Sequence, residues 1–202
     1  MRINRIKILL LLLGLPIFAL GQNRLFTSLG VSVSNVNWIG VEEAGYKLKP
    51  SKILSVGFDI RKNDRIRIEN KLRFISTGYK VISGSGNLNI DFNYLELAPL
   101  VKCDIFESLY MGAGGYISLL LNQDYEFIRA ERNSDIGING GMGFEIKKIE
   151  FYLEYNHGLR GLRNKSAVLP STQFYNYGFN FTMNYHFYVF PSKVHQKNKN
   201  IY

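Results

Sequence analysis

The chain has little cysteine and histidine, and after its first 21 residues it has no long apolar run. The single cysteine, Cys103, cannot form an internal disulfide, so we expect a small buried or lipid-facing hydrophobe there. One cysteine and three scattered histidines give no metal-ligand spacing, and no metal site is predicted. A membrane-spanning helix needs about 20 apolar residues. Any membrane span in residues 22–202 must therefore be made of strands.

Basic residues outnumber acidic ones, and the formal net charge is +9. Three of the positive charges lie in the first seven residues, and three more lie in the last ten. A nucleic-acid surface needs basic residues gathered on one face together with aromatic platforms. Here the aromatic residues fall on the face opposite the charges, so nucleic acid is not expected as a partner.

Residues 1–21 have the features of a secretory signal peptide. A basic start precedes an apolar run from Ile8 to Leu20, and the small residues Ala19 and Gly21 stand before a cut at Gln22. An uncleaved signal anchor is the alternative interpretation. No cysteine follows the apolar run, so the chain is not expected to be a lipoprotein.

Residues 173–187 alternate between an apolar and a polar chemistry with one exception, Phe174. The odd positions are Tyr175, Tyr177, Phe179, Phe181, Met183, Tyr185 and Phe187, and the even positions after Phe174 are Asn176, Gly178, Asn180, Thr182, Asn184 and His186. Successive side chains of a strand point to opposite faces, so one face is aromatic and the other is small and amide-rich. A strand with lipid outside and a polar lumen inside has this pattern.

Periodicity predicts an all-β fold, an eight-stranded up-and-down transmembrane β-barrel over residues 22–188, followed by a basic C-terminal tail over residues 189–202. The predicted strands are 25–34, 52–61, 65–79, 87–103, 108–121, 135–147, 149–160 and 173–188. The predicted tight turns lie at 62–64, 104–107 and Lys148, whereas 35–51, 80–86, 122–134 and 161–172 are predicted to be long or irregular. Alternating short and long connections are typical of outer-membrane barrels, with the short turns on the periplasmic side.

The segment 87–103 has a less regular pattern. Ile90, Phe92 and Tyr94 share one phase, whereas Leu95 and Leu97 share the other. One extra residue near Tyr94, a β-bulge, would reset the phase. A soluble periplasmic lipocalin-like barrel, with its apolar side chains inside, is a further alternative for the whole chain.

Several short motifs resemble a known family. Residues 93–102, NYLELAPLVK, resemble the "YLEIPLLLK"-type strand of the PorT-like outer-membrane barrel family of Bacteroidetes. The segments 110–114 (YMGAG), 135–143 (DIGINGGMG) and 155–159 (YNHGL) are similar as well. The chain departs from the family pattern at Ala98, an extra residue before the proline, and in its polar tail. The resemblance implies an outer-membrane barrel with a part in protein secretion or envelope assembly.

Charges of both signs are expected inside the barrel. The predicted inward set is Arg65, Arg67, Glu69, Lys71, Arg73, Asp91, Glu96, Glu145, Glu150 and Glu154. Eight strands enclose an interior just wide enough for side chains to fill it, and unpaired buried charges are costly. The set favours a salt-bridged plug over an ion path or a proton relay.

Catalysis is not expected. An outer-membrane lipid deacylase could place a serine two residues from a histidine on one strand face, but the residue two after His157 is Leu159. The glycines of segments 112–115 and 137–143 lie within strands, where they make room for large neighbours, so no cofactor is predicted.

The predicted partners are outer-membrane lipid and envelope or secretion proteins. Arginine matches phosphate geometry, so basic residues of the long connections could meet lipopolysaccharide phosphates. These residues are Arg129, Arg132, Arg160, Arg163 and Lys165. The predicted protein is an outer-membrane barrel with a structural, assembly-related or secretion-related role, and a lipid-modifying enzyme is the alternative.

Overall fold

The computed structural model describes residues 22–39, 46–83, 86–123, 134–160, 162–163 and 173–190. The predicted signal peptide and the tail from residue 191 lie outside these residues. The strands are β1 (Gln22–Ile39), β2 (Tyr46–Lys47), β3 (Lys49–Arg61), β4 (Ile66–Ser83), β5 (Gly86–Asp104), β6 (Leu109–Gln123), β7 (Ser134–Ile146), β8 (Ile149–Gly158), β9 (Leu162–Arg163) and β10 (Gln173–Phe190). No helix in the described part of the chain is long and apolar enough to cross a membrane.

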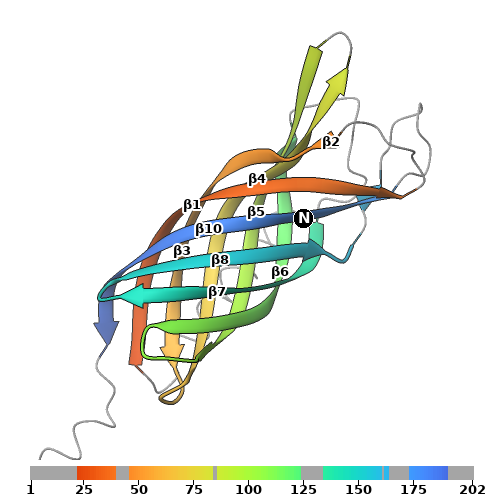
Figure 1. The fold of residues 1–202 in the computed structure, drawn as a ribbon. Helices are drawn as coiled ribbons and strands as arrows, with labels where there is room; N and C mark the ends of the chain where they lie inside the picture. The colour runs from red at the N-terminus through yellow and green to blue at the C-terminus, as the bar shows by residue number, and fades with distance from the viewer. Residues whose placement is uncertain are drawn as a thin grey trace, which may run out of the picture.

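Eight long antiparallel strands close into a barrel (Figure 1). They pair in the order β1–β3–β4–β5–β6–β7–β8–β10, and β10 pairs back with β1. The two-residue strands β2 and β9 pair with β4 and β10. The predicted eight-stranded up-and-down barrel is confirmed.

The predicted faces of β10 are confirmed as well. Phe179, Phe181 and Phe187 are about half exposed, whereas Asn180 and Asn184 are almost fully buried. Exposed apolar side chains recur around the barrel, and many of its charged residues are buried inside, together with some apolar residues such as Phe26 and Phe92. The most exposed outward side chains of the strands include Leu29, Val31, Leu54, Val56, Val101, Met111, Ile117, Ile138, Met142 and Leu153. A polar interior excludes the lipocalin-like alternative, which needs apolar side chains inside.

The long strands β4 and β5 correct one predicted connection. Residues 80–83 and Gly86 belong to these strands, which stay paired up to Ser83 and Gly86. Residues 80–86 are therefore a hairpin tip and not a long irregular loop, because the strand pattern of 79–83 continues the ladder. The hairpin extends beyond the barrel wall at the end opposite the tight turns (Figure 1).

The predicted bulge in the 87–103 strand is wrong, because the irregularity near Tyr94 lies on the neighbouring strand. Tyr94 pairs with Leu120 and Asn93 with Asn122, so the extra residue is Leu121 of β6. The β5 register against β4 is unbroken. The phase of β5 therefore does not reset, and Ile90, Phe92 and Tyr94 are buried on the same face as Glu96.

Glycines in β6 and β7 make room for tyrosines, as predicted. A Cβ at Gly137 would collide with the Tyr116 ring, and one at Gly143 would collide with the Tyr110 hydroxyl. A Cβ at Gly112 would lie 2.9 Å from the Tyr152 hydroxyl. Inward tyrosines thus fill the side of the lumen where the wall has no side chains.

The barrel has a turn end and a loop end. The tight turns 62–65, 105–108 and 147–148 join β3 to β4, β5 to β6 and β7 to β8. They gather at one end, toward the lower left in Figure 1, with the start of β1 and the end of β10. Strand β10 continues to Phe190, two residues past the predicted boundary. In barrels of this type the turn end faces the periplasm.

Candidate functional site: the charged lumen

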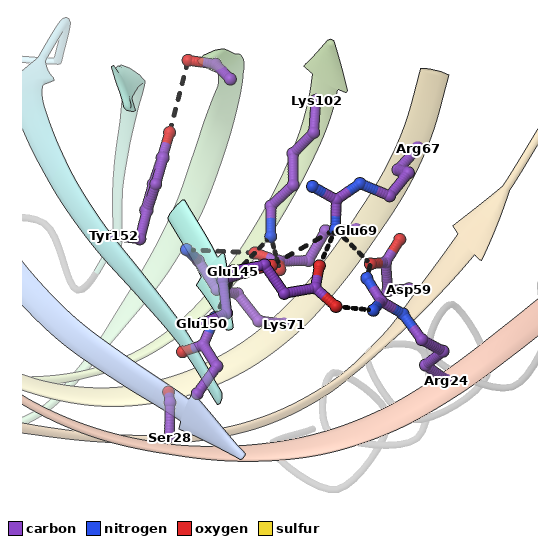
Figure 2. Close-up of polar contacts among 12 residues, drawn as sticks. Arg24, Ser28, Asp59, Arg67, Glu69, Lys71, Lys102, Glu145, Glu150 and Tyr152 are labelled. Carbon is purple, nitrogen blue, oxygen red and sulfur yellow. Dashed lines mark hydrogen bonds and ion pairs between the residues drawn. The ribbon is translucent and has the colours of Figure 1, made fainter. Parts of the chain in front are cut away.

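The interior of the barrel holds a connected set of ionised side chains. Its cations are Arg24, Arg67, Lys71, Arg73 and Lys102, and its carboxylates are Asp59, Glu69, Glu96, Glu145, Glu150 and Glu154, with Asp104 at the turn end. Every second residue of a strand points to the same face, and the charges of these strands recur with that spacing on the inward face. Figure 2 shows part of the set, in which Arg24, Arg67 and Lys102 meet carboxylates from other strands.

Near the turn end, Arg67 of β4 is the centre of a cluster. Its guanidinium donates to Asp104 Oδ1 at 2.8 Å and to Glu145 Oε2 at 2.9 Å, and its Nη1 lies 3.4 Å from Asp59 Oδ2. Arg24 of β1 lies on the other side of the same carboxylates, donating to Asp59 at 2.6 Å and to Glu145. Two guanidinium groups thus share two carboxylates (Figure 2).

Beside Arg67, which it faces across the β4–β5 ladder, Lys102 of β5 is fully buried between two carboxylates. Its Nζ lies 2.5 Å from Glu69 Oε2 and 2.6 Å from Glu150 Oε1. Glu150 also accepts from Asn184 Nδ2 at 2.7 Å. Lys71 joins this group to the next, with Nζ 3.3 Å from Glu69. Each buried charge therefore has an opposite charge in contact, as a low-dielectric interior requires.

Toward the loop end, the Glu154 carboxylate of β8 accepts from four donors. Lys71 at 3.1 Å and Asn139 at 3.2 Å donate to Oε2. Asn180 at 3.2 Å and Arg73 donate to Oε1. Arg73 also donates to Glu96 on the adjacent β5. No lone pair direction of Glu154 is left to water, which fits its 1% exposure.

Several ion pairs join strands that are not neighbours in the wall. Arg73 and Lys71 on β4 meet Glu154 on β8, the strand diametrically opposite in the ring of eight. Arg24 on β1 meets Glu145 on β7, and Lys102 on β5 meets Glu150 on β8. Such contacts cross the lumen, so charged side chains from opposite parts of the wall meet inside it.

Two stacked tyrosines line the lumen beside the cations. The Tyr110 and Tyr152 rings lie 5.6 Å apart and are nearly parallel. Arg67 lies 4.8 Å and Lys102 4.7 Å from the Tyr110 ring centroid, which is within cation–π distance. The aromatic faces supply further stabilisation to cations that have left water.

A small polar cavity lies at the loop end of this set. Its volume of about 20 Å³ holds roughly one water. Its lining includes Ser32, Thr77, Glu96 and Asn176. Glu96, which pairs with Arg73, connects the cavity to the charged set.

One cluster near the turn end has potential metal ligands. Glu145, Glu150 and His186 have ligand atoms within 4.8 Å of one another. Arg67 Nη1 already contacts both carboxylates, at 2.9 and 3.4 Å, and Lys102 contacts Glu150. A metal ion would have to displace these cations, so the residues present fit a salt bridge better than a metal.

The structure corrects two members of the predicted inward set. Arg65 is exposed in the 62–65 turn, because the strand begins one residue later. Asp91 lies on the phase opposite to buried Ile90 and Phe92, where it contacts Ser76 and Lys49. The other eight predicted residues all belong to the connected set.

The predicted inward set lacks Arg24, Asp59, Lys102 and Asp104. Asp59 alternates with Phe58 and Ile60, and Lys102 shares the phase of Glu96, so alternation could have found both. Arg24 lies just before the predicted start of its strand, at residue 25. Its inward position becomes evident only when β1 is extended to Gln22.

The two histidines of the strands differ in environment. His157 stacks beside Tyr155, with ring centroids 6.3 Å apart, and the Tyr155 hydroxyl lies 3.4 Å from its Nδ1. His186 is buried next to Phe26, and its Nε2 lies 3.7 Å from Glu150. Neither histidine contacts a serine among the described residues.

Known proteins share this fold at low sequence identity. Neisserial surface protein A is similar with a TM-score of 0.54 and 9% identity, over 81% of this chain and 97% of that chain. OprG from Pseudomonas aeruginosa has a TM-score of 0.49 and 13% identity, over 83% and 97%. No protein-family model matches the sequence, and no curated protein matches it significantly. The similarity to Neisserial surface protein A supports the fold alone.

A closed eight-stranded barrel with an apolar exterior and a polar interior is the architecture of outer-membrane proteins. Closure pairs every wall strand on both sides, so the backbone can cross lipid without unsatisfied polar groups. The predicted location in the bacterial outer membrane is confirmed by this architecture.

Proposed function

We propose that this protein is a non-conducting, non-enzymatic outer-membrane barrel with a structural, envelope-assembly or secretion-related role. The observation that carries the proposal is the set of ion pairs that cross the lumen, above all those from Arg73 and Lys71 to Glu154. A lumen filled in this way leaves no path for solutes. The surfaces at the two ends and the outer wall remain for interactions with other envelope components.

The resemblance of residues 93–102 to the PorT-like family supports the secretion-related form of the role. These residues form the central part of β5, where Glu96 and Lys102 take part in the lumen set. The motif thus coincides with residues that close the lumen. A secretion role would then be accessory, exerted on other proteins, because substrates cannot pass through this barrel.

The alternative is an enzyme that acts on outer-membrane lipid. Such an enzyme needs a nucleophile and a base on the lipid-facing surface. The histidine on that surface, His157, contacts Tyr155 and is followed on the same face by Leu159. These surroundings favour an aromatic position at the membrane interface over a catalytic base.

A deletion strain separates the two proposals. Loss of an assembly or secretion role should change the amounts of secreted and outer-membrane proteins while the lipid A mass profile stays the same. The complemented strain should restore the parental amounts. An altered lipid A profile with unchanged protein amounts would support the enzyme and contradict our proposal.

A further inference from the structure

The turn end of the barrel has a surface that the lumen does not explain. We call the exposed segments 61–66, 105–109 and 146–149 the turn rim. Its cations are Arg61, Lys62, Arg65, Lys147 and Lys148, whereas its carboxylates are Asp64 and Glu107. Arg61 lies 3.4 Å from Asp104. Within the described chain, the other four cations form no ion pair, so their charge is available to a partner.

The positions of three cations along the chain set their depth in the membrane. Arg65 directly precedes Ile66, and Lys147 and Lys148 stand between Ile146 and Ile149. These isoleucines are exposed on the outer wall, from 38% to 56%, and mark the lower edge of its apolar band. Because each cationic residue directly adjoins an isoleucine of the apolar band, its ammonium or guanidinium group lies at the level of the lipid headgroups.

The backbone at Lys147 gives an independent indication that a cation is favoured there. Lys147 has φ of 59°, in the left-handed region that glycine or asparagine adopts with less strain. A two-residue hairpin turn normally uses these residues. A lysine at this position implies that its side chain has a use which offsets the backbone cost.

An exposed aromatic residue places the rim in the interface. Phe106, at the tip of the 105–108 turn, is 70% exposed, next to the exposed Ile105. A phenylalanine at a turn tip in water would be unfavourable, whereas aromatic residues are common at the membrane interface. The turn tips are therefore in contact with the headgroup layer.

We propose that the turn rim binds the headgroups of anionic phospholipids in the periplasmic leaflet. The cations come from the β3–β4 and β7–β8 turns, at separate places on the circumference of the barrel. Lipid headgroups surround a barrel on all sides, whereas an acidic protein would need the cations gathered in one patch. A long lysine or arginine side chain can extend to a lipid phosphate group and pair with it, while the barrel keeps its depth in the bilayer.

The test uses the full-length mature protein in nanodiscs of equal parts phosphatidylglycerol and phosphatidylcholine. The lipids that stay with the protein after detergent extraction are counted by mass spectrometry. The rim variant carries Arg65→Gln, Lys147→Gln and Lys148→Gln. Its control carries Lys47→Gln, Lys52→Gln and Lys80→Gln, which remove the same charge at the loop end.

Among the lipids retained next to each rim cation of the parent, phosphatidylglycerol should outnumber phosphatidylcholine by about fivefold. The rim variant should retain the two lipids equally, and the control should keep the parental excess. Raising the salt concentration should also remove the excess from the parent, because these charges are exposed. Equal retention in the parent, equal loss in both variants, or an excess that resists salt would each overturn the proposal.

Discussion

Glu154→Gln should destabilise the barrel by about 3 kcal/mol, since removing one partner of a buried ion pair costs about 3–5 kcal/mol. The structure places the effect at the low end of this range. Arg73 keeps Glu96 as a partner, and Lys71 keeps Glu69 at 3.3 Å. Each Glu154 oxygen accepts hydrogen bonds from donors. In the glutamine variant an NH₂ group replaces one of these oxygens, and its protons would point at donors instead of acceptors.

The assay is denaturant unfolding of the barrel in lipid vesicles, followed by the gel shift between folded and unfolded forms. The matched control is Glu107→Gln in the exposed 105–108 turn, which should change stability by less than about 0.5 kcal/mol. Lys71→Gln combined with Glu154→Gln should cost less than the sum of the single variants, with a coupling of about 0.5–3 kcal/mol. Strictly additive costs, or parental stability of Glu154→Gln, would refute the buried ion pair.

Two further substitutions test the outer wall and the lumen packing. Phe181→Arg, midway along the outward positions of β10, should impair insertion by about 2–4 kcal/mol, whereas Ile146→Arg at the lower edge should cost about 0–1 kcal/mol; equal folding yields in vesicles would contradict the assigned depths. Gly143→Ala should cost about 1–3 kcal/mol because its methyl group meets the Tyr110 hydroxyl, and Gly140→Ala, whose nearest contact is at 3.5 Å, should be tolerated. Equal denaturation midpoints of the two glycine variants would contradict this packing.

The strands and their faces could be predicted because a period of two is a local property. The alternation in residues 173–187 was enough to separate lipid-facing Phe181 from lumen-facing Asn180. Alternation also assigned most of the charges in β4 and β8 to the lumen. Arg65 was misplaced because β4 begins one residue later, and Asp91 because the phase of β5 does not reset, so that Ile90 and Phe92 point inward.

The partners of each charge could not be predicted, because they depend on how strands far apart in sequence are staggered. Glu154 meets Lys71 and Arg73 across the lumen only because β4 and β8 are opposite in the closed ring. The bulge illustrates the same limit. The apolar residues Ile90 and Phe92 suggested an extra residue in 87–103, but the β5 register is unbroken and these side chains are buried in the lumen.

The central claim is that an outer-membrane barrel of this size is closed by ion pairs across its lumen, and planar-bilayer conductance tests it most directly. Purified protein, shown by its gel shift to be folded, should give no large, steady current. Arg73 and Lys71 from β4 and Glu154 from β8 occupy the cross-section in that state. A steady porin-like conductance of the folded parent protein would contradict the account.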